Sequence, residues 1–245
     1  MAAGIPLLDL GNQRLKLARS TGPGQVDLIA SVRLQELQAE QGVQWLSDEL
    51  RRFDGPALVC STRPELLQAW QAESRLADLL LVLQKEQLPL DVRTTGTGMD
   101  RLLASLAAWR LSNGAVLVAD LGTAWTLDAT TAQGAFLGGA IGLGLGMQDR
   151  ALQEACPHLD LAADQPCSGI PMNTSDAVAE GSRTALALAL DALGWAYEQD
   201  LEGGAQRYLC GGDARTIAPW MSADWTYADH LVLQGMAWVA HDIGR

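Results

Sequence analysis

Two aspartates follow short apolar runs that resemble each other. The stretch "LLDLGNQRLK" (7–16) contains Asp9 and "VADLGTAWT" (118–126) contains Asp120, and each Asp is followed by one Leu and one Gly. A glycine allows the sharp turn that directs successive backbone N–H groups into one concave surface, where they bind an anion. A carboxylate beside such a loop holds hydrated Mg²⁺ that bridges to phosphate oxygens. The repeat therefore predicts two phosphate loops that hold one nucleoside triphosphate.

The residues after each Asp-Leu-Gly also suit phosphate. Lys16 supplies a positive charge seven residues after Asp9, and Thr123 and Thr126 supply hydroxyls after Asp120. An Asp-x-Gly at a strand end is often only a turn, but two copies in similar contexts favour a binding function. The chain has no GxxxxGK[ST] motif and no strand-linked GxGxxG motif, so the common nucleotide-binding folds have no support.

A third carboxylate lies in a different context. Asp100 follows "TTGTGM" (94–99) and precedes an apolar-periodic helix expected at 101–112. An alcohol that attacks a phosphoryl group loses its proton, and a carboxylate within ~3 Å of that hydroxyl accepts it. The guanidinium of Arg101 is suited to a substrate that carries a carboxylate. The alternative interpretation is that Asp100 only caps the helix, which Asp does often.

Two sets of strands and helices must position these residues. Short apolar runs at 5–10, 57–61 and 115–120 predict buried strands, with partner strands at 15–18, 26–33, 124–130 and 134–141. Helical periodicity is expected over 34–52, 63–77, 101–112, 147–156, 174–197 and 229–241. This order of elements predicts an α/β protein of two domains with mixed sheets, residues 1–113 and 114–245.

Composition limits the possible partners. The 245 residues are 48% hydrophobic and carry a net charge of −12, which disfavours nucleic acid and predicts a sizeable core. No apolar run approaches the ~18 residues of a membrane span, and the N-terminus does not resemble a signal peptide. We therefore expect a cytoplasmic protein that binds neither nucleic acid nor membrane.

Six short blocks, in this order, resemble the type III pantothenate kinases, also called Bvg accessory factor-like proteins. The blocks are "DLGNQRLK", "GMDR", "DLGTAWTLD", "GAFLGGAIGLGLGMQDRAL", "TSDAVAEG" and "CGGDA", and they span nearly the whole chain. That family belongs to the superfamily of acetate and sugar kinases, heat-shock ATPases and actin. The resemblance implies two ribonuclease-H-like domains, each a mixed sheet flanked by helices, with ATP in the cleft between them.

The resemblance also implies a role for each matching residue. Asp100 is the general base of a kinase that phosphorylates pantothenate to 4′-phosphopantothenate, the first step of coenzyme A biosynthesis. Gly98, Met99, Asp100, Arg101 and Thr174 contact pantothenate. ATP is bound by Asp9, Leu10, Gly11, Asn12, Gln13, Arg14, Leu15, Lys16 and Thr123.

The resemblance further implies two cations and a second subunit. Asp9 holds Mg²⁺ through the ATP phosphates, and Asp120 binds a monovalent cation, K⁺ or NH₄⁺. Family members are homodimers in which the pantothenate site is completed near the interface. The Ala- and Leu-rich helix expected at 174–197 is a candidate dimer helix, although packing within one subunit explains its composition equally well.

Departures from the family pattern leave two alternatives open. Gln13 stands where the family usually has Thr or Ser, the usual Pro-Gly after "GGAI" is replaced by "GLGLGM", and the Tyr before the GxDR block is missing. One alternative is a kinase of another small hydroxyl substrate on the same fold. The other is a non-catalytic nucleotide-binding regulator.

Overall fold

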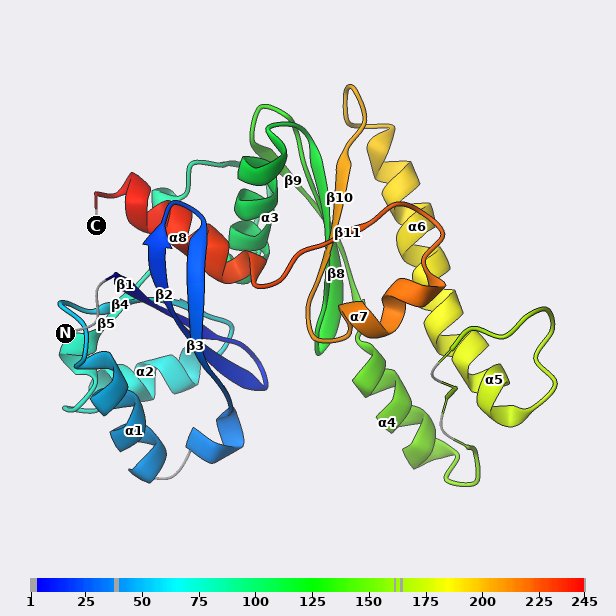
Figure 1. Cartoon of the computed structure of the whole chain (residues 1–245), viewed down its shortest axis with the longest axis horizontal. Helices are drawn as coiled ribbons and strands as arrows, with labels where there is room; N and C mark the ends of the chain where they lie inside the picture. Colours follow the sequence, from blue (N-terminus) through cyan, green and yellow to red (C-terminus); the bar gives the residue numbers. More distant parts are fainter. Residues whose placement is uncertain (1–3, 38–39, 161, 164, 245) are drawn as a thin grey trace. The chain divides into compact units, whose positions relative to one another are not determined.

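The computed structural model describes residues 4–37, 40–160, 162–163 and 165–244, which form two compact units (Figure 1). The first unit comprises Met1–Leu90, Thr95–Ala107 and Leu231–Arg245, and the second comprises Asp91–Thr94 and Ala108–His230. This division differs from the ranges 1–113 and 114–245 expected from the sequence. The C-terminal helix α8 (Leu231–Asp242) joins the first unit because it packs on that unit's strands.

The first unit is built on a five-stranded mixed sheet in the order β3-β2-β1-β4-β5. Its strands are β1 (Ile5–Leu10), β2 (Arg14–Gly22), β3 (Gln25–Arg33), β4 (Ala57–Ser61) and β5 (Leu80–Val82). β1 pairs with β2 in the antiparallel and with β4 in the parallel direction. The apolar runs at 5–10 and 57–61 thus form the central strands, as predicted.

Helices cover both faces of this sheet. On one face, α1 (Glu40–Leu50) and α2 (Pro64–Ala72) bury Leu46, Leu50, Leu67 and Trp70 against alternate residues of β1, β2 and β4. The helix expected over 34–52 begins instead with a separate 3-10 turn at Leu34–Leu37. On the other face, α8 contacts β1, β2, β3 and β4 (Figure 1). Gly235 of α8 leaves room for the backbone of Leu103 in α3 (Met99–Ser112).

The second unit contains a six-stranded mixed sheet in the order β11-β10-β7-β8-β9-β6. Its strands are β6 (Asp91–Val92), β7 (Val116–Leu121), β8 (Ala124–Thr130), β9 (Ala135–Leu143), β10 (Gln206–Cys210) and β11 (Thr226–Tyr227). The short strands β5, β6 and β11 were not predicted. Each is only two or three residues long, too short for an alternating pattern to be recognised.

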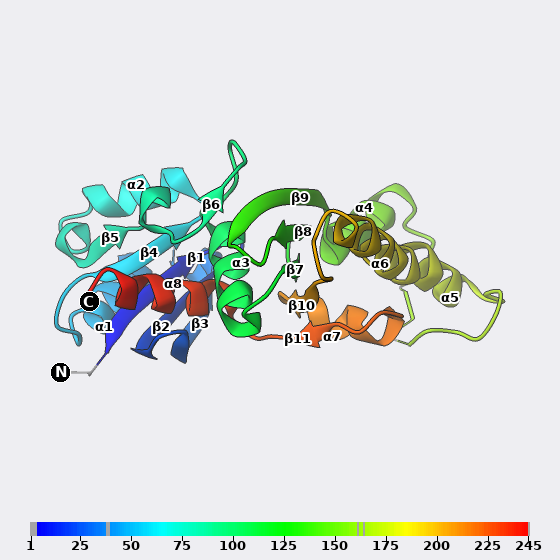
Figure 2. The same cartoon turned by 90° about the horizontal axis from the view of Figure 1, so that it is seen from above.

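Four helices belong to the second unit: α4 (Leu145–Ala155), α5 (Thr174–Ala179), α6 (Ala185–Glu198) and α7 (Ala214–Ile217) (Figure 2). The continuous helix expected over 174–197 is interrupted by a π-helical turn at Glu180–Thr184 between α5 and α6. Leu186, Ala187 and Leu190 of α6 pack with alternate residues of β7 and β8 in one buried cluster. The described residues contain no helix that is long and apolar enough to cross a membrane.

The two sheets share one arrangement of strands. In each, three antiparallel strands (β1-β2-β3 and β7-β8-β9) are extended on the side of the first strand by two parallel strands, β4-β5 and β10-β11. The predicted α/β fold with two mixed sheets flanked by helices is therefore confirmed. The similarity between the two halves is stronger in strand order than in sequence.

Candidate functional site

The first predicted loop is a tight turn between β1 and β2. The Gly11 N–H donates to the Arg14 carbonyl over 3.0 Å and closes the turn. Asp9, near the end of β1, pairs in register with Lys16 on β2 and with Cys60 on β4. These three residues lie on the sheet face opposite the buried cluster that contains Leu8 and Leu10. The strand ladders thus place one carboxylate between a cation and a thiol.

Asp9 is a buried carboxylate with one nearby cation. The residue is 7% exposed, and Lys16 Nζ lies 3.7 Å from Asp9 Oδ2. Burial raises the pKa of Asp9 to about 6, the ion pair with Lys16 opposes this rise, and the neighbouring Asp100 carboxylate adds to it. Burial is also the main cause of the raised pKa of the Cys60 thiol, with Asp9 and Asp100 as further causes. The carboxylates of Asp9 and Asp100 in the first unit are therefore near enough for their charges to interact.

The other predicted loop residues differ in what they offer to a ligand. The side chains of Leu10 and Leu15 are fully buried, so only their backbone groups are available. The Arg14 guanidinium donates to Ser31 Oγ and to the Ser31 carbonyl over 2.9 and 2.8 Å, which holds it along β3. The side chains of Asn12 and Gln13 are exposed at the turn.

A further cation reaches this loop from β4. The Arg63 guanidinium donates to the Asn12 carbonyl over 3.2 Å, and the Thr62 N–H donates to the Leu10 carbonyl over 3.0 Å. Arg63 was not predicted as a site residue, because no sequence motif marks it. Its position directly after the buried strand 57–61 was the one available signal, since parallel neighbouring strands end at the same edge of a sheet.

The raised pKa of Asp9 predicts how the stability of the ligand-free protein depends on pH. The pKa of Asp9 is 3.8 in the unfolded chain and about 6 in the folded protein. The contribution of protonated Asp9 to the free energy of unfolding is therefore complete below pH 3.8 and is lost as the pH rises through 6. Between pH 5 and pH 8 the free energy of unfolding of the wild type should fall by about 1 kcal/mol more than that of Asp9→Asn, which does not titrate. Urea unfolding of both proteins without Mg²⁺ measures this difference, and a difference that does not change with pH would refute it.

The second predicted group lies at the start of α3. The helix begins at Met99, two residues before the predicted start, so Asp100 lies in the first turn and is not the N-cap. Its carboxylate folds back over Gly98, where a Cβ would overlap Asp100 Oδ1. A negative charge in the first turn interacts favourably with the helix dipole. Asp100 is half-buried and Arg101 follows it in the same turn.

Asp120 occupies in the second unit the position that Asp9 has in the first. It pairs in register with Thr126 on β8 and with Cys210 on β10. The next residue of the β10 segment, Gly211, has φ +96°, and a Cβ there would lie 2.5 Å from Asp120 Oδ1 and overlap the Leu121 carbonyl oxygen. A glycine at 211 therefore lets the backbone after β10 pass directly against the Asp120 carboxylate and the Leu121 carbonyl.

Two more glycines bring neighbouring loops close to Asp120. A Cβ on Gly144 would overlap the Gly122 carbonyl and lie 2.6 Å from the Thr123 carbonyl oxygen. The Gly144 N–H donates to the Thr123 carbonyl over 3.0 Å, which joins the segment before α4 to the β7–β8 turn. The segments around Gly122, Gly144 and Gly211 thus form one cluster, which we call the Asp120 loops.

Thr174 lies in the second unit at the start of α5. The preceding residue, Asn173, is the N-cap, and its side chain accepts from the Asp176 N–H over 2.9 Å. Thr174 is exposed, as are Ile170 and Met172, which are 87% and 91% exposed in the same connection. The structure thus brings Asp9, Lys16 and Asp100 together in the first unit and places Asp120, Thr123 and Thr174 in the second. The convergence of all these residues on one site stays a prediction.

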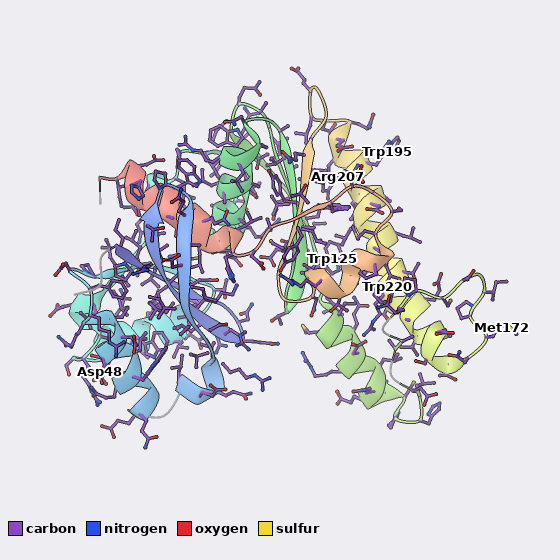
Figure 3. The ribbon with its side chains drawn as sticks, in the orientation of Figure 1. Asp48, Trp125, Met172, Trp195, Arg207 and Trp220 are labelled. Carbon is purple, nitrogen blue, oxygen red and sulfur yellow. The ribbon has the colours of Figure 1, made fainter. Side chains whose placement is uncertain are left out.

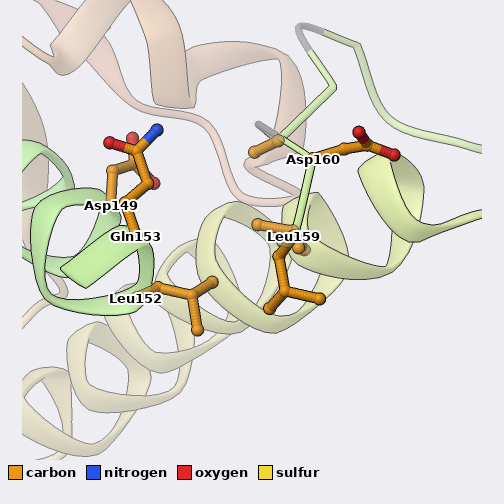
Figure 4. Close-up of a pocket in the computed structure, with 7 residues that line it drawn as sticks. Asp149, Leu152, Gln153, Leu159 and Asp160 are labelled. Carbon is orange, nitrogen blue, oxygen red and sulfur yellow. The ribbon is translucent and has the colours of Figure 1, made fainter. Parts of the chain in front are cut away.

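A half-buried ion pair joins α4 to the π-helical turn. Arg183 donates to both carboxylate oxygens of Asp149 over 2.7 and 2.8 Å. Asp149 also borders a pocket together with Leu152, Gln153, Leu159 and Asp160 (Figure 4). Its free space of about 10 Å³ is enough for roughly one water molecule. The pocket is therefore too small for a nucleotide or for pantothenate.

The described residues suit a cation that takes some oxygen ligands from the protein and the others from phosphate or water. Among these residues no group of three or more His, Cys, Asp and Glu side chains is suited to holding a metal ion. Mg²⁺ in kinases is commonly held by one or two carboxylates plus substrate phosphates and waters. Asp9 is a carboxylate of the kind that such an arrangement uses.

Solved structures of low sequence identity share the fold. A Baf family protein from Campylobacter jejuni has a TM-score of 0.68 at 18% identity, with 98% of each chain covered. MreB5 of Spiroplasma citri, solved with ADP, has a TM-score of 0.51 at 12% identity and covers 98% of this chain and 97% of its own. The fold is that of the actin-like ATPases and sugar kinases.

Sequence comparison identifies the family. A model of type III pantothenate kinase matches residues 6–194. A type III pantothenate kinase from Chromobacterium violaceum is 35% identical over 244 residues, which cover 96% of this chain and 98% of the relative. The chain belongs to the type III pantothenate kinase family.

Proposed function

We propose that this chain transfers the γ-phosphoryl group of ATP to the primary hydroxyl of pantothenate, yielding 4′-phosphopantothenate for coenzyme A biosynthesis. Family membership over nearly the full length carries this proposal. The buried Asp9–Lys16 pair beside the β1–β2 turn and the nearby Asp100 carboxylate support it. Phosphoryl transfer asks a protein mainly to position reactants and to stabilise charge, which suits rigid loops at strand ends.

Each unit contributes a different part of this chemistry. Asp9 and Lys16 bind the triphosphate end of ATP, with Lys16 neutralising phosphate charge once it leaves Asp9. Asp100 accepts the proton of the attacking hydroxyl, and Arg101 binds the pantothenate carboxylate. In the second unit, Asp120 holds a monovalent cation, Thr123 contacts ATP and Thr174 contacts pantothenate. Bound Mg²⁺ would neutralise charge on the phosphate oxygens.

An assay of ADP release tests the proposal directly. The protein is incubated with ATP, Mg²⁺ and K⁺, with and without pantothenate, and the product is identified by its mass. Pantothenate-dependent ADP release with formation of 4′-phosphopantothenate is expected. If another hydroxyl compound stimulates ADP release more strongly than pantothenate, the chain is a kinase of that other substrate. If the chain binds nucleotide without any turnover, it is a non-catalytic regulator.

We further propose that the chain is a homodimer and that α6 forms part of the interface. Leu188 and Trp195 are 56% and 64% exposed on this helix, and Trp195 is labelled in Figure 3. Ala185 and Ala192 are exposed as well, so the four residues follow one another at spacings of three and four along one face. Large exposed apolar residues beside small ones are typical of a face that packs on another helix.

A charge on this face should separate the subunits. Trp195→Glu places a carboxylate on the apolar stripe, and burying it unpaired costs several kcal/mol. We expect monomers for Trp195→Glu and dimers for the wild type by size-exclusion chromatography with light scattering. Gln41→Glu, which adds the same charge at an exposed position of α1, is the matched control. Dimers of unchanged stability in Trp195→Glu would exclude α6 from the interface.

A further inference from the structure

The segment that leads from β4 into α2 is fastened to the end of β1. The Thr62 N–H and the Thr62 hydroxyl both donate to the Leu10 carbonyl, over 3.0 and 3.3 Å. The Arg63 N–H donates to Ser61 Oγ over 2.9 Å. Pro64 follows at the start of α2, where its ring fixes its own φ. These contacts hold the backbone of Arg63 in a defined position beside the β1–β2 turn.

The side chain of Arg63 lies against that turn. Arg63 Nη1 donates to the Asn12 carbonyl over 3.2 Å, and the residue is exposed. A guanidinium carries several N–H donors in a planar fork that matches the oxygens of a phosphate. Within the described part of the chain, the Asn12 carbonyl is the one acceptor of this side chain. The other donors are therefore available to a ligand at the turn.

The charges around the turn favour an anionic ligand at Arg63. Lys16 Nζ lies 3.7 Å from Asp9 Oδ2, so that carboxylate offsets its charge. No Asp or Glu side chain of the described residues forms an ion pair with Arg63. The Asp9 and Asp100 carboxylates add negative charge here, and a triphosphate that binds beside them needs a cation that is not already neutralised. Arg63 is such a cation.

The tip of the turn provides further donors. The bond from the Gly11 N–H to the Arg14 carbonyl closes the turn and uses neither the Asn12 N–H nor the Gln13 N–H. Successive backbone N–H groups in a turn bind anions. The Gln13 N–H belongs to the same planar peptide group as the Asn12 carbonyl, so the bond from Arg63 also limits the rotation of that group. Arg63 is thus attached to the part of the turn that offers N–H groups to phosphate.

We propose that Arg63 is a phosphate-binding residue, which donates to phosphate oxygens of ATP at the β1–β2 turn. The proposal rests on the proposed function, which places the triphosphate at this turn. Arg63 lies outside the six sequence blocks that resemble the family, so it is an addition to the residues expected from them. Arg101 remains the residue for the pantothenate carboxylate. Loss of Arg63 therefore weakens the binding of ATP and leaves the binding of pantothenate unchanged.

Calorimetric titration with ATP and Mg²⁺, in the absence of pantothenate, measures this contact. Arg63→Ala should weaken ATP binding about tenfold or more, the factor that a hydrogen bond between charged groups is worth. In the ADP-release assay, its KM for pantothenate should stay within a factor of about two of the wild-type value. Wild-type ATP affinity in Arg63→Ala would overturn the proposal. A raised KM for pantothenate at wild-type ATP affinity would assign Arg63 to the other substrate and would overturn it as well.

A second variant separates the charge of Arg63 from its attachment to the turn. Arg63→Gln keeps an N–H donor for the Asn12 carbonyl but removes the charge, and it should lose as much ATP affinity as Arg63→Ala. Wild-type affinity in Arg63→Gln would mean that Arg63 only holds the turn, which would overturn the phosphate contact. Since salt screens exposed charges, the difference in affinity between the wild type and either variant should narrow as KCl is raised. A difference that is independent of salt would contradict a contact between charges.

Arg52→Ala is the matched control. It removes the same charge from an exposed position of the first unit, where the guanidinium pairs with Glu49 over 3.0 Å. This variant should bind ATP as the wild type does. Weaker binding in Arg52→Ala, by the same factor as in Arg63→Ala, would mean that the net charge of the protein sets the affinity, which would overturn the specific role of Arg63.

The binding measurement also separates this inference from the proposed function. A wild type that binds ATP but does not phosphorylate pantothenate would refute the kinase activity, while the Arg63 variants would still decide the phosphate contact by binding alone. A wild type that phosphorylates pantothenate, with unchanged ATP affinity in Arg63→Ala, would refute the role of Arg63 and leave the kinase activity standing. A wild type that binds no ATP would refute both.

Discussion

Asp100→Asn should lower kcat by a factor of roughly 10²–10⁴ while leaving nucleotide affinity close to the wild-type value. Asparagine has nearly the same shape as aspartate but accepts no proton at neutral pH. In the structure Asp100 is a half-buried residue in the first turn of α3, where its carboxylate folds back over Gly98 and lies near Asp9. The proposed role of Asp100 as the proton acceptor predicts this loss.

Two measurements distinguish loss of the base from loss of the fold. The kcat comes from pantothenate-dependent ADP release, and the nucleotide affinity comes from fluorescence titration with an ATP analogue in the presence of Mg²⁺. Asp78→Asn, at an exposed carboxylate of the first unit, is the matched control and should behave as the wild type. If kcat of Asp100→Asn stays within a factor of about two, Asp100 is not the proton acceptor.

Replacing K⁺ with Na⁺ should reduce activity about 10–100-fold, and Asp120→Asn should lower both the K⁺-supported rate and its difference from Na⁺. Asp120 lies near the end of β7, and the backbone at Gly211 passes against its Oδ1 and the Leu121 carbonyl. A weakly charged, large cation takes such carbonyl and carboxylate oxygens in place of its hydration shell. Asp120→Asn removes an anionic ligand from the proposed cation site.

The measurement is a pair of salt titrations at constant ionic strength. ADP release is followed with K⁺, NH₄⁺ and Na⁺ chlorides for the wild type and Asp120→Asn. Asp128→Asn is unsuitable as a control because Asp128 is buried at 2% exposure, whereas Asp200→Asn alters an exposed carboxylate of the same unit. Equal rates in all three salts for the wild type would remove the monovalent cation from the proposed function.

The carboxylates were the most predictable part of the candidate site. Asp9 and Asp120 were recognisable because a short apolar run, an Asp and a Gly together mark a buried strand and its turn, and both lie on such strands. The strand at 57–61 was recognisable for the same reason. Local periodicity is enough for these elements because burial on both sides leaves a continuous apolar run.

Other parts of the site have no local signal. Arg63 reaches the first loop only because β4 lies beside β1, and Gly211 lies against Asp120 only because β10 lies beside β7. Helix α8 likewise has no local signal for its place: it follows the second unit in the sequence but belongs to the first. Each depends on strand pairing or helix packing between segments distant in the chain, which periodicity within one segment cannot indicate.

The sequence by itself determined the central strands, the two Asp-Leu-Gly turns, the candidate base at the start of α3 and the family, because each rests on a short run of neighbouring residues. Only the tertiary structure decided that Asp9 is paired with Lys16 and has a pKa of about 6, and that the segment before α4 is bonded to the β7–β8 turn. The physical reason is that burial, charge pairing and hydrogen bonding depend on which groups meet in space. Residues far apart in the chain bring those groups together.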